Sequence, residues 1–116
     1  MLSVCIPVYN YFIQDFVNEI VKQCNELNII FELIIFDDNS DTKYANENRK
    51  LKTEKNIIYH YNQKNAGRSA ARNGLAKLAQ HENLLFIDCD SMPYKNTFIK
   101  DFIKYSDYQI VCGGTI

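Results

Sequence analysis

The chain has 116 residues, which is enough for one domain built on one hydrophobic core. Its net charge of −1 provides no basic surface field for nucleic acid and no polybasic membrane anchor, and its apolar runs fall far short of the ~20 residues that span a bilayer. With 47% apolar and 23% charged residues, the composition is typical of a globular domain. These values exclude nucleic acid as a partner and leave membrane association only to regions outside this segment.

The four cysteines indicate the cellular compartment. No pair of them has C-x-x-C spacing, which argues against a zinc site, and three fall in or beside apolar, strand-like runs. We expect reduced thiols that are mostly buried as small hydrophobic side chains. A cytoplasmic protein is therefore expected, placed at the cytoplasmic face of the membrane if other regions attach it. No basic segment followed by a cleavage site opens the chain, so we expect no export signal.

The first half of the chain alternates apolar and amphipathic stretches. Residues 2–6 form an apolar run that predicts a short buried strand, ended by Pro7. Apolar residues then recur every three or four positions over 12–27, which predicts a helix. A second strand is predicted at 31–36, and the polar segment 39–56 is either a loop or an exposed helix.

The second half continues the same alternation. A third strand is predicted at 57–61, and the segment 69–79, rich in Ala and Leu, predicts a helix. A fourth strand follows at 84–87, then a short helix at 97–105 and the start of a fifth strand at 110–112. Because the sequence continues for only four residues beyond that strand, we expect the chain to be the front part of a longer protein.

Strands that alternate with helices define the expected fold class. They predict βαβ units, a mainly parallel sheet with helices on both faces, and right-handed crossovers. The chain is thus expected to be an α/β domain, without internal repeats or an obvious linker between domains.

Two acidic clusters follow predicted strands. Asp37 and Asp38 follow the second strand in "FELIIFDDNS", and Asp88 and Asp90 flank Cys89 after the fourth strand in "NLLFIDCDS". In an open α/β sheet, the ligand crevice lies at the carboxyl ends of the strands, so both clusters should face one crevice. Carboxylate oxygens are ligands for a hard divalent cation, which in turn binds phosphates. The pattern predicts a metal-dependent site for a phosphorylated ligand.

Two further segments carry candidate binding residues. The first strand leads into "PVYN", where Tyr9 could either offer a flat face to a base or simply pack. In "NAGRSAARN", Gly67 permits unusual backbone angles, and Ser69 is the predicted N-cap of the following helix. Arg72 could approach a diphosphate, or it could form a structural ion pair with one of the acidic clusters.

The four segments "IPVYN", "DDNS", "NAGRSAARN" and "DCD" occur in this order over nearly the whole chain. This ordered set resembles the family 2 glycosyltransferases of the GT-A fold. The resemblance implies a Rossmann-like nucleotide-binding domain and makes residues 1–116 the nucleotide-sugar-binding part of such an enzyme. It also implies metal-dependent transfer of a sugar from a nucleotide-sugar donor, with a UDP-sugar expected, to the hydroxyl group of an acceptor.

The resemblance assigns roles to the nucleotide-binding residues. Pro7 and Tyr9 would line the pocket for the base, usually uracil. Asp38 would accept a hydrogen bond from the base N–H, which suits an acceptor-only carboxylate. Gly67 and Arg72 would lie near the nucleotide at the start of the helix. In the alternative for Asp38, acidic and amide side chains of this segment cap the following turn, a role better suited to its neighbours at positions 37 and 39.

The resemblance also assigns a metal site. Asp90 would bind Mn²⁺ or Mg²⁺, and Asp88 would contact the ribose or a water bound to the metal. Many members of the family have a further acidic residue after the D-x-D motif, whereas this chain continues with Ser91 and Met92. The metal's surroundings are therefore not fixed by the resemblance.

The remaining parts of a transferase are not identifiable in this segment. The family's catalytic base and its acceptor-binding region come later than the helix that follows the D-x-D motif, so no catalytic residue is assigned here. The acceptor is an unknown glycan, lipid or protein, and this chain alone is expected to be inactive. Two other classes remain open: a phosphatase of the haloacid dehalogenase type, and a receiver-like α/β binding module.

Overall fold

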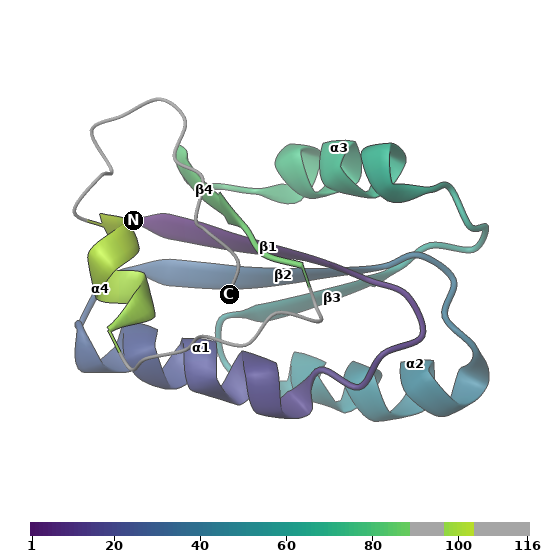
Figure 1. Ribbon diagram of the computed structural model, residues 1–116, viewed down its shortest axis with the longest axis horizontal. Helices are drawn as coiled ribbons and strands as arrows, with labels where there is room; N and C mark the ends of the chain where they lie inside the picture. Colours follow the sequence, from purple (N-terminus) through teal and green to yellow (C-terminus); the bar gives the residue numbers. More distant parts are fainter. Residues whose placement is uncertain (89–96, 104–116) are drawn as a thin grey trace.

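The computed structural model describes residues 1–88 and 97–103, which form an α/β domain around a parallel sheet (Figure 1). The order of the four strands across the sheet is β3-β2-β1-β4. The strands are β1 (Leu2–Val8), β2 (Phe31–Asp37), β3 (Ile57–Tyr61) and β4 (Asn83–Phe86). The helical elements are α1 (Gln14–Glu26), α2 (Thr42–Arg49), the 3₁₀ turn η1 (Lys50–Thr53), α3 (Arg68–Leu78) and α4 (Phe98–Ile103).

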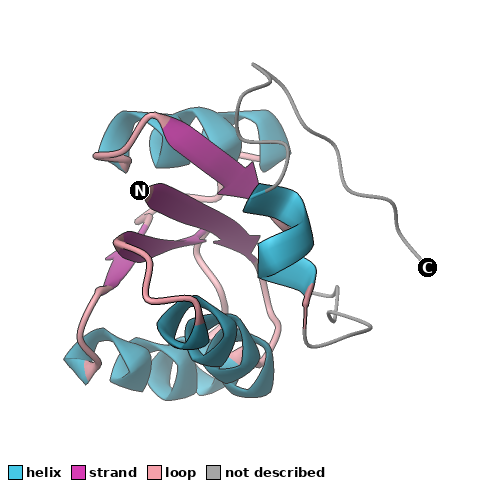
Figure 2. Cartoon of the chain, turned by 90° about the vertical axis from the view of Figure 1, so that its left-hand side faces the viewer, coloured by secondary structure: helices cyan, strands magenta, loops and turns pink. Residues whose placement is uncertain are grey.

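Helices cover both faces of the sheet, as predicted. Figure 1 shows α1 and α2 below the sheet and α3 above it, and Figure 2 shows the same layers from the end. Two separate apolar clusters fill the spaces between the layers, and the smaller one lies under α3. It is formed by Cys5, Ile34, Phe36, Ala71 and Leu75. Because β2 is covered on both sides, all seven of its residues are buried, which explains the unbroken apolar run over residues 33–36.

The strands are aligned so that their carboxyl ends share one edge, which we call the carboxyl edge. The pairing of β1 with β2 extends until Val8 lies opposite Asp37. The pairing of β1 with β4 ends earlier, where Cys5 lies opposite Phe86. The carboxyl end of β1 therefore has β2 on one side and no described strand on the other.

The prediction that Pro7 ends the first strand was wrong, because β1 continues to Val8. Residues on β1 point their backbone groups alternately to its two neighbours. The carbonyl of Cys5 accepts from Ile87 on the β4 side, and the carbonyl of Val8 accepts from Asp38 on the β2 side. The missing N–H of Pro7 thus faces the side on which β4 has already ended, so the strand loses no hydrogen bond there.

The other predicted elements differ from the structure mainly at their ends. The polar segment 39–56 contains α2 and η1, so the helical alternative was correct for its middle part. Of the predicted helix at 97–105, the structure describes α4, and the predicted strand at 110–112 lies outside the described residues. None of the described helices is long and apolar enough to cross a membrane.

Candidate functional site

The strand order itself locates a ligand crevice. From β1 the chain moves in one direction to β2 and β3, and α3 then carries it back across the sheet to β4 on the other side of β1. In open α/β sheets, ligands bind outside the carboxyl ends of the strands where the direction reverses, which here is between β1 and β4. Tyr9 follows β1, Asp38 follows β2 and Asp88 follows β4, so the sheet brings all three to the carboxyl edge.

Asp38 is the central side chain at this edge. It is 6% exposed, and its carboxylate accepts hydrogen bonds from the backbone N–H groups of Ala66 (2.8 Å) and Gly67 (2.9 Å). The amide of Asn62 donates a third bond at 3.2 Å. Hydrogen bonds to an ionised acceptor are stronger than neutral ones. Asp38 therefore fixes the connection between β3 and α3 against the end of β2.

Asp37 has a structural role, as the turn-capping alternative predicted. One of its carboxylate oxygens accepts from the backbone N–H of Ser40 at 2.8 Å, and the other accepts from the hydroxyl of Tyr59. Burial, together with this contact to Asp37, raises the pKa of the Tyr59 hydroxyl far above its ordinary value. Asn39 also holds the turn, because its side chain donates to the carbonyl of Gln63 and accepts from a tyrosine of β3.

The N-cap of α3 lies two residues before the predicted one. Gly67, not Ser69, occupies the N-cap position, and its φ of 90° lies in a region that other residues rarely adopt. This conformation lets the chain turn directly from the N–H groups held by Asp38 into the helix. The expectation that Gly67 allows an unusual backbone conformation was correct, and the predicted role of Ser69 was wrong.

Arg72 extends from α3 toward the end of β4. Its guanidinium lies 3.2 Å from the carboxylate of Asp88 and 5.8 Å from the ring centroid of Phe86. The two charged side chains are 42% and 45% exposed. Such half-exposed ion pairs contribute only about 0–1 kcal/mol to stability. The ion-pair alternative for Arg72 is thus correct, and the weakness of the pair leaves both groups available to a charged ligand.

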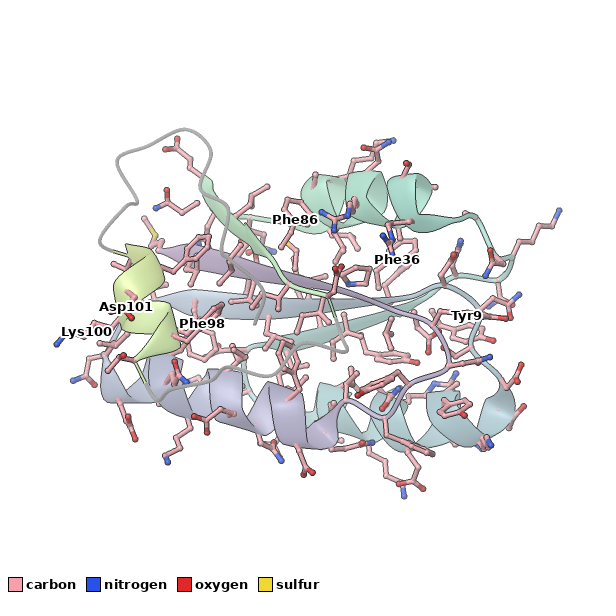
Figure 3. The ribbon with its side chains drawn as sticks, in the orientation of Figure 1. Tyr9, Phe36, Phe86, Phe98, Lys100 and Asp101 are labelled. Atoms are coloured by element: carbon pink, nitrogen blue, oxygen red, sulfur yellow. The ribbon has the colours of Figure 1, made fainter. Side chains whose placement is uncertain are left out.

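Pro7 and Tyr9 lie at the carboxyl end of β1. Tyr9 is 52% exposed, so it is not a core packing residue, and Pro7 is half-buried directly before it. Figure 3 shows Tyr9 at the end of the molecule that carries the carboxyl edge. An exposed aromatic ring beside a crevice provides a flat apolar surface on which a base can stack.

The proposed metal site is only partly within the described residues. Asp88 is described, whereas Asp90 lies outside them. Within 1–88 and 97–103, no group of three or more His, Cys, Asp or Glu side chains could hold a metal ion. The chemistry of the two aspartates nevertheless fits Mg²⁺ or Mn²⁺, because both supply hard carboxylate oxygens and such ions take further oxygens from phosphates.

Sequence reasoning identified Asn39 as a turn residue but missed the other amides that shape this edge. Asn10 and Asn39 both have positive φ angles, of 51° and 68°, which asparagine tolerates better than most residues. Asn62 and Asn48 hold neighbouring segments in place. The sequence signal for them was the asparagine that follows each of the first three strands, which is also common in ordinary turns.

A Rossmann-type sheet with acidic and aromatic residues at its switch point defines the class of nucleotide-binding α/β domains. The sequence description of glycosyl transferase family 2 matches residues 3–116, and the chain belongs to this family. Two uncharacterized glycosyltransferases, from Rickettsia conorii and Rickettsia felis, are each 35% identical to it over 95 residues, which is 82% of this chain. The chain spans only 15% of the length of these relatives.

Solved structures of other proteins are also similar to this chain. The structure of S. aureus TarS 1–349 is similar with a TM-score of 0.73 and 27% identity, over 91% of this chain and 32% of that one. TarS 1–349 has also been solved in complex with UDP and with UDP-GlcNAc. A mannosyltransferase from Pyrobaculum calidifontis, in complex with GDP-Man and Mn²⁺, has a TM-score of 0.76 over 90% of this chain and 31% of that one. At 18% identity, this second likeness shows the fold alone.

These findings confirm the GT-A-like α/β fold and the family. The two other classes kept open by the sequence do not fit the observed topology. A receiver-like domain has the strand order 2-1-3-4-5, whereas here β2 lies between β1 and β3. A haloacid dehalogenase-type phosphatase carries its D-x-D motif on the first strand, whereas Asp88 follows the fourth.

Proposed function

We propose that this chain is the donor-binding part of a glycosyltransferase and that it binds a nucleoside diphosphate sugar, with UDP as the nucleotide. The observation that carries the proposal is the arrangement of Tyr9, Asp38 and the start of α3 around the switch point of the sheet. The complexes of TarS with UDP and UDP-GlcNAc support a uridine nucleotide.

In this proposal the base lies between β1 and the Asp38 loop. Tyr9 provides the stacking surface, and Pro7 shapes the wall beside it. An ionised carboxylate has about four lone-pair sites. Three donors already contact Asp38, so a site remains for the N–H of the base. Asp38 would then serve both as a structural tie and as the group that recognises the base.

The diphosphate would be bound by charge. Arg72 can exchange its contact with Asp88 for one with a phosphate oxygen, because the present pair is half-exposed and weak. Asp88 and Asp90 would hold Mn²⁺ or Mg²⁺. When bound, the metal neutralises negative charge on the diphosphate and so favours departure of the nucleotide. Gly67 keeps the backbone at the start of α3 free of a side chain near this region.

We propose that the chain is part of a longer protein, which the greater length of its relatives supports, and that the catalytic base and the acceptor site lie in the remainder. We propose that the acceptor is a hydroxyl group on a glycan, lipid or protein. The chain alone should bind the donor without transferring the sugar, because transfer requires a positioned base and a bound acceptor. The cytoplasmic location stays a prediction from the cysteine pattern.

Calorimetry with UDP tests the proposal. We expect saturable binding of UDP in the presence of Mn²⁺ and much weaker binding with a chelator. Asp88→Asn should lower the affinity for Mn²⁺ and UDP together. UMP, which lacks the second phosphate, should depend less on the metal. Equal binding of UDP with and without metal would contradict the metal role of the D-x-D motif, and an absence of UDP binding would contradict the proposed function.

A further inference from the structure

The fully buried amide of Asn48 lies outside the predicted site but is bonded to the loop that carries Tyr9. Asn48 is on α2 and is 0% exposed. Its oxygen accepts from the backbone N–H of Ile13 at 3.2 Å, and its nitrogen donates to the backbone carbonyl of Tyr11 at 2.7 Å. One side chain thus satisfies a donor and an acceptor of the 9–13 loop, two residues apart.

The same loop is fixed at a second point. The backbone N–H of Asn10 donates to the hydroxyl of Ser40 at 2.9 Å, and its side-chain oxygen accepts from the N–H of Asp41 at 2.7 Å. Segment 40–48 therefore holds the loop on both sides of Tyr11. Tyr9 lies between this attachment and the end of β1, and its side chain is 52% exposed, so the loop largely determines where the ring lies.

We propose that Asn48 is a positioning residue for nucleotide binding: it presets the 9–13 loop so that Tyr9 faces the base. This inference rests on the proposed function, since it assumes that Tyr9 contacts the nucleotide. Among the described residues, the side chain of Asn48 bonds only to backbone groups of the loop, so it would act through the loop and not on the ligand. A loop that is preset before binding lowers the entropy lost on binding.

The isosteric variant Asn48→Asp tests this proposal, because lowering the pH should restore the hydrogen bond that the substitution removes. An ionised aspartate can accept from Ile13, but it has no proton to donate to the carbonyl of Tyr11. A protonated aspartate restores both bonds, and burial favours the protonated form. We therefore expect the UDP affinity of Asn48→Asp to be roughly 5- to 10-fold below wild type near pH 8 and to recover toward wild type near pH 5.5. The apparent affinity falls because only a fraction of the molecules then has the 9–13 loop in the conformation that binds the base.

The affinity is read as the ratio of variant to wild type at each pH. The two proteins share UDP, the metal-binding carboxylates and the titratable residues beside Asn48. Any pH dependence that arises from these groups therefore cancels in the ratio. On α2 these residues are Glu47 and Arg49, and on the facing segment they are Tyr11 and Asp15. Asn48→Ser is a second variant. Its single hydroxyl oxygen replaces the two separate amide atoms that bond to Ile13 and Tyr11, so at least one of the two bonds should weaken, and the affinity for UDP should fall without a pH-dependent recovery.

Gln23→Glu is the matched control. Gln23 is also a buried amide, and its oxygen accepts from the backbone N–H of Ile99, which joins α1 to α4 at the opposite edge of the sheet (Figure 1). The same change from amide to acid should make the unfolding free energy of the Gln23→Glu variant depend on pH, while its affinity for UDP stays at the wild-type value. This separates a general loss of stability from a loss of loop positioning.

The outcomes are distinguishable. If wild type does not bind UDP, the proposed function fails and this inference fails with it. If wild type binds UDP and both Asn48→Asp and Asn48→Ser, folded, bind it equally well at pH 8, only the positioning role is overturned. If Asn48→Asp is unfolded at pH 8, the ratio is read at lower pH together with Asn48→Ser, and an affinity for UDP equal to wild type in both folded variants would likewise overturn the role.

Discussion

At the scale of single residues, Asp38 has a structural role that the sequence did not predict, in addition to the expected role in recognising the base. Its carboxylate is the acceptor for two backbone N–H groups of the β3–α3 connection, and it is also the candidate acceptor for the base. The nearby Asp37 is occupied by the turn and by Tyr59. Two adjacent aspartates with the same chemistry are thus separated in role by the direction in which each points.

Replacing Asp38 by asparagine should destabilise the domain. The amide nitrogen would face a backbone N–H of Ala66 or Gly67, which leaves a buried donor without an acceptor. Such a loss costs about 1–3 kcal/mol in the free energy of unfolding. Urea denaturation measures it, with Glu26→Gln, an exposed carboxylate-to-amide change, as the control. Equal stability of Asp38→Asn and wild type would contradict the structural tie.

Gly67→Ala should also destabilise the chain, for a different reason. A Cβ at this position would meet no atom within 4 Å, so space is not the obstacle. The φ of 90° is strained for any residue with a side chain and costs about 1–3 kcal/mol. Thermal unfolding should show a lower midpoint, and UDP affinity should fall as well if α3 shifts at its first turn. An unchanged midpoint would mean that this backbone conformation is not required.

The role of a residue could be predicted from the sequence where it depends on a property of the residue type. It could not be predicted where it depends on where the fold places the residue. Gly67 and the acidic residues were identified from the sequence because positive φ and clustered charge are properties of the residue type. The role of Asn48 was not, because nothing in the segment "YANENR" distinguishes a buried asparagine from an exposed one. Ser69 was wrongly predicted as a cap, because serine is a common cap and glycine at position 67 had already turned the chain.

At the scale of the elements, α3 approaches the sheet closely at Gly74. A Cβ on Gly74 would lie 2.6 Å from the Phe36 ring. On its other side this ring packs against His60, with 5.0 Å between the ring centroids. The glycine therefore sets the distance between α3 and β2, and with it the distance of Arg72 from the sheet.

A double-mutant cycle tests this contact. Gly74→Ala should gain about 1 kcal/mol of helix propensity but lose more through overpacking, which costs about 1–3 kcal/mol. Phe36→Leu alone should be destabilising, because it leaves space beneath α3. In the double variant, the new methyl group should fill part of that space, so the combined loss in unfolding free energy should be smaller than the sum of the single losses. Simple additivity would contradict direct packing of Gly74 on Phe36.

At the scale of the whole molecule, the two described cysteines provide a measure of burial. Burial raises the pKa of the Cys24 thiol from 9.0 to about 12, and it raises that of Cys5 similarly. Between pH 9 and pH 12 the thiol keeps its proton in the folded chain and loses it in the unfolded chain, whereas below pH 9 it keeps its proton in both. The contribution of the thiol to stability is therefore complete below pH 9. It is lost as the pH rises from 9 toward 12, at about 1.4 kcal/mol per pH unit for each thiol.

Comparing Cys24→Ala with wild type isolates one thiol. The variant should show a shallower fall of unfolding free energy above pH 9, by about one ionisation. Below pH 9 the two curves should run parallel, with an offset for the lost packing. Denaturant titrations over this pH range provide the measurement. Parallel curves throughout would mean that the Cys24 thiol ionises equally in the folded and unfolded chains.

The overall architecture was predictable because it depends on periodicity, which local sequence carries. The strands of the sheet, the helices on both faces and the shared carboxyl edge of Asp38 and Asp88 all followed from that pattern. The end of β1 did not, because whether Pro7 costs a hydrogen bond depends on where β4 ends, far along the chain. The strand order was likewise decided by long-range packing, and it is the strand order that locates the crevice.

The most direct test of the account is to locate the nucleotide by NMR. Addition of UDP with Mg²⁺ to the isotope-labelled chain should shift the backbone amide signals of Tyr9, Asp38 and Gly67 and of the first turn of α3. The amides at the opposite edge, such as those of Ser3 and Gln80, should stay unchanged. Saturable shifts confined to that opposite edge, or no saturable shift at all, would contradict a nucleotide site at the carboxyl edge.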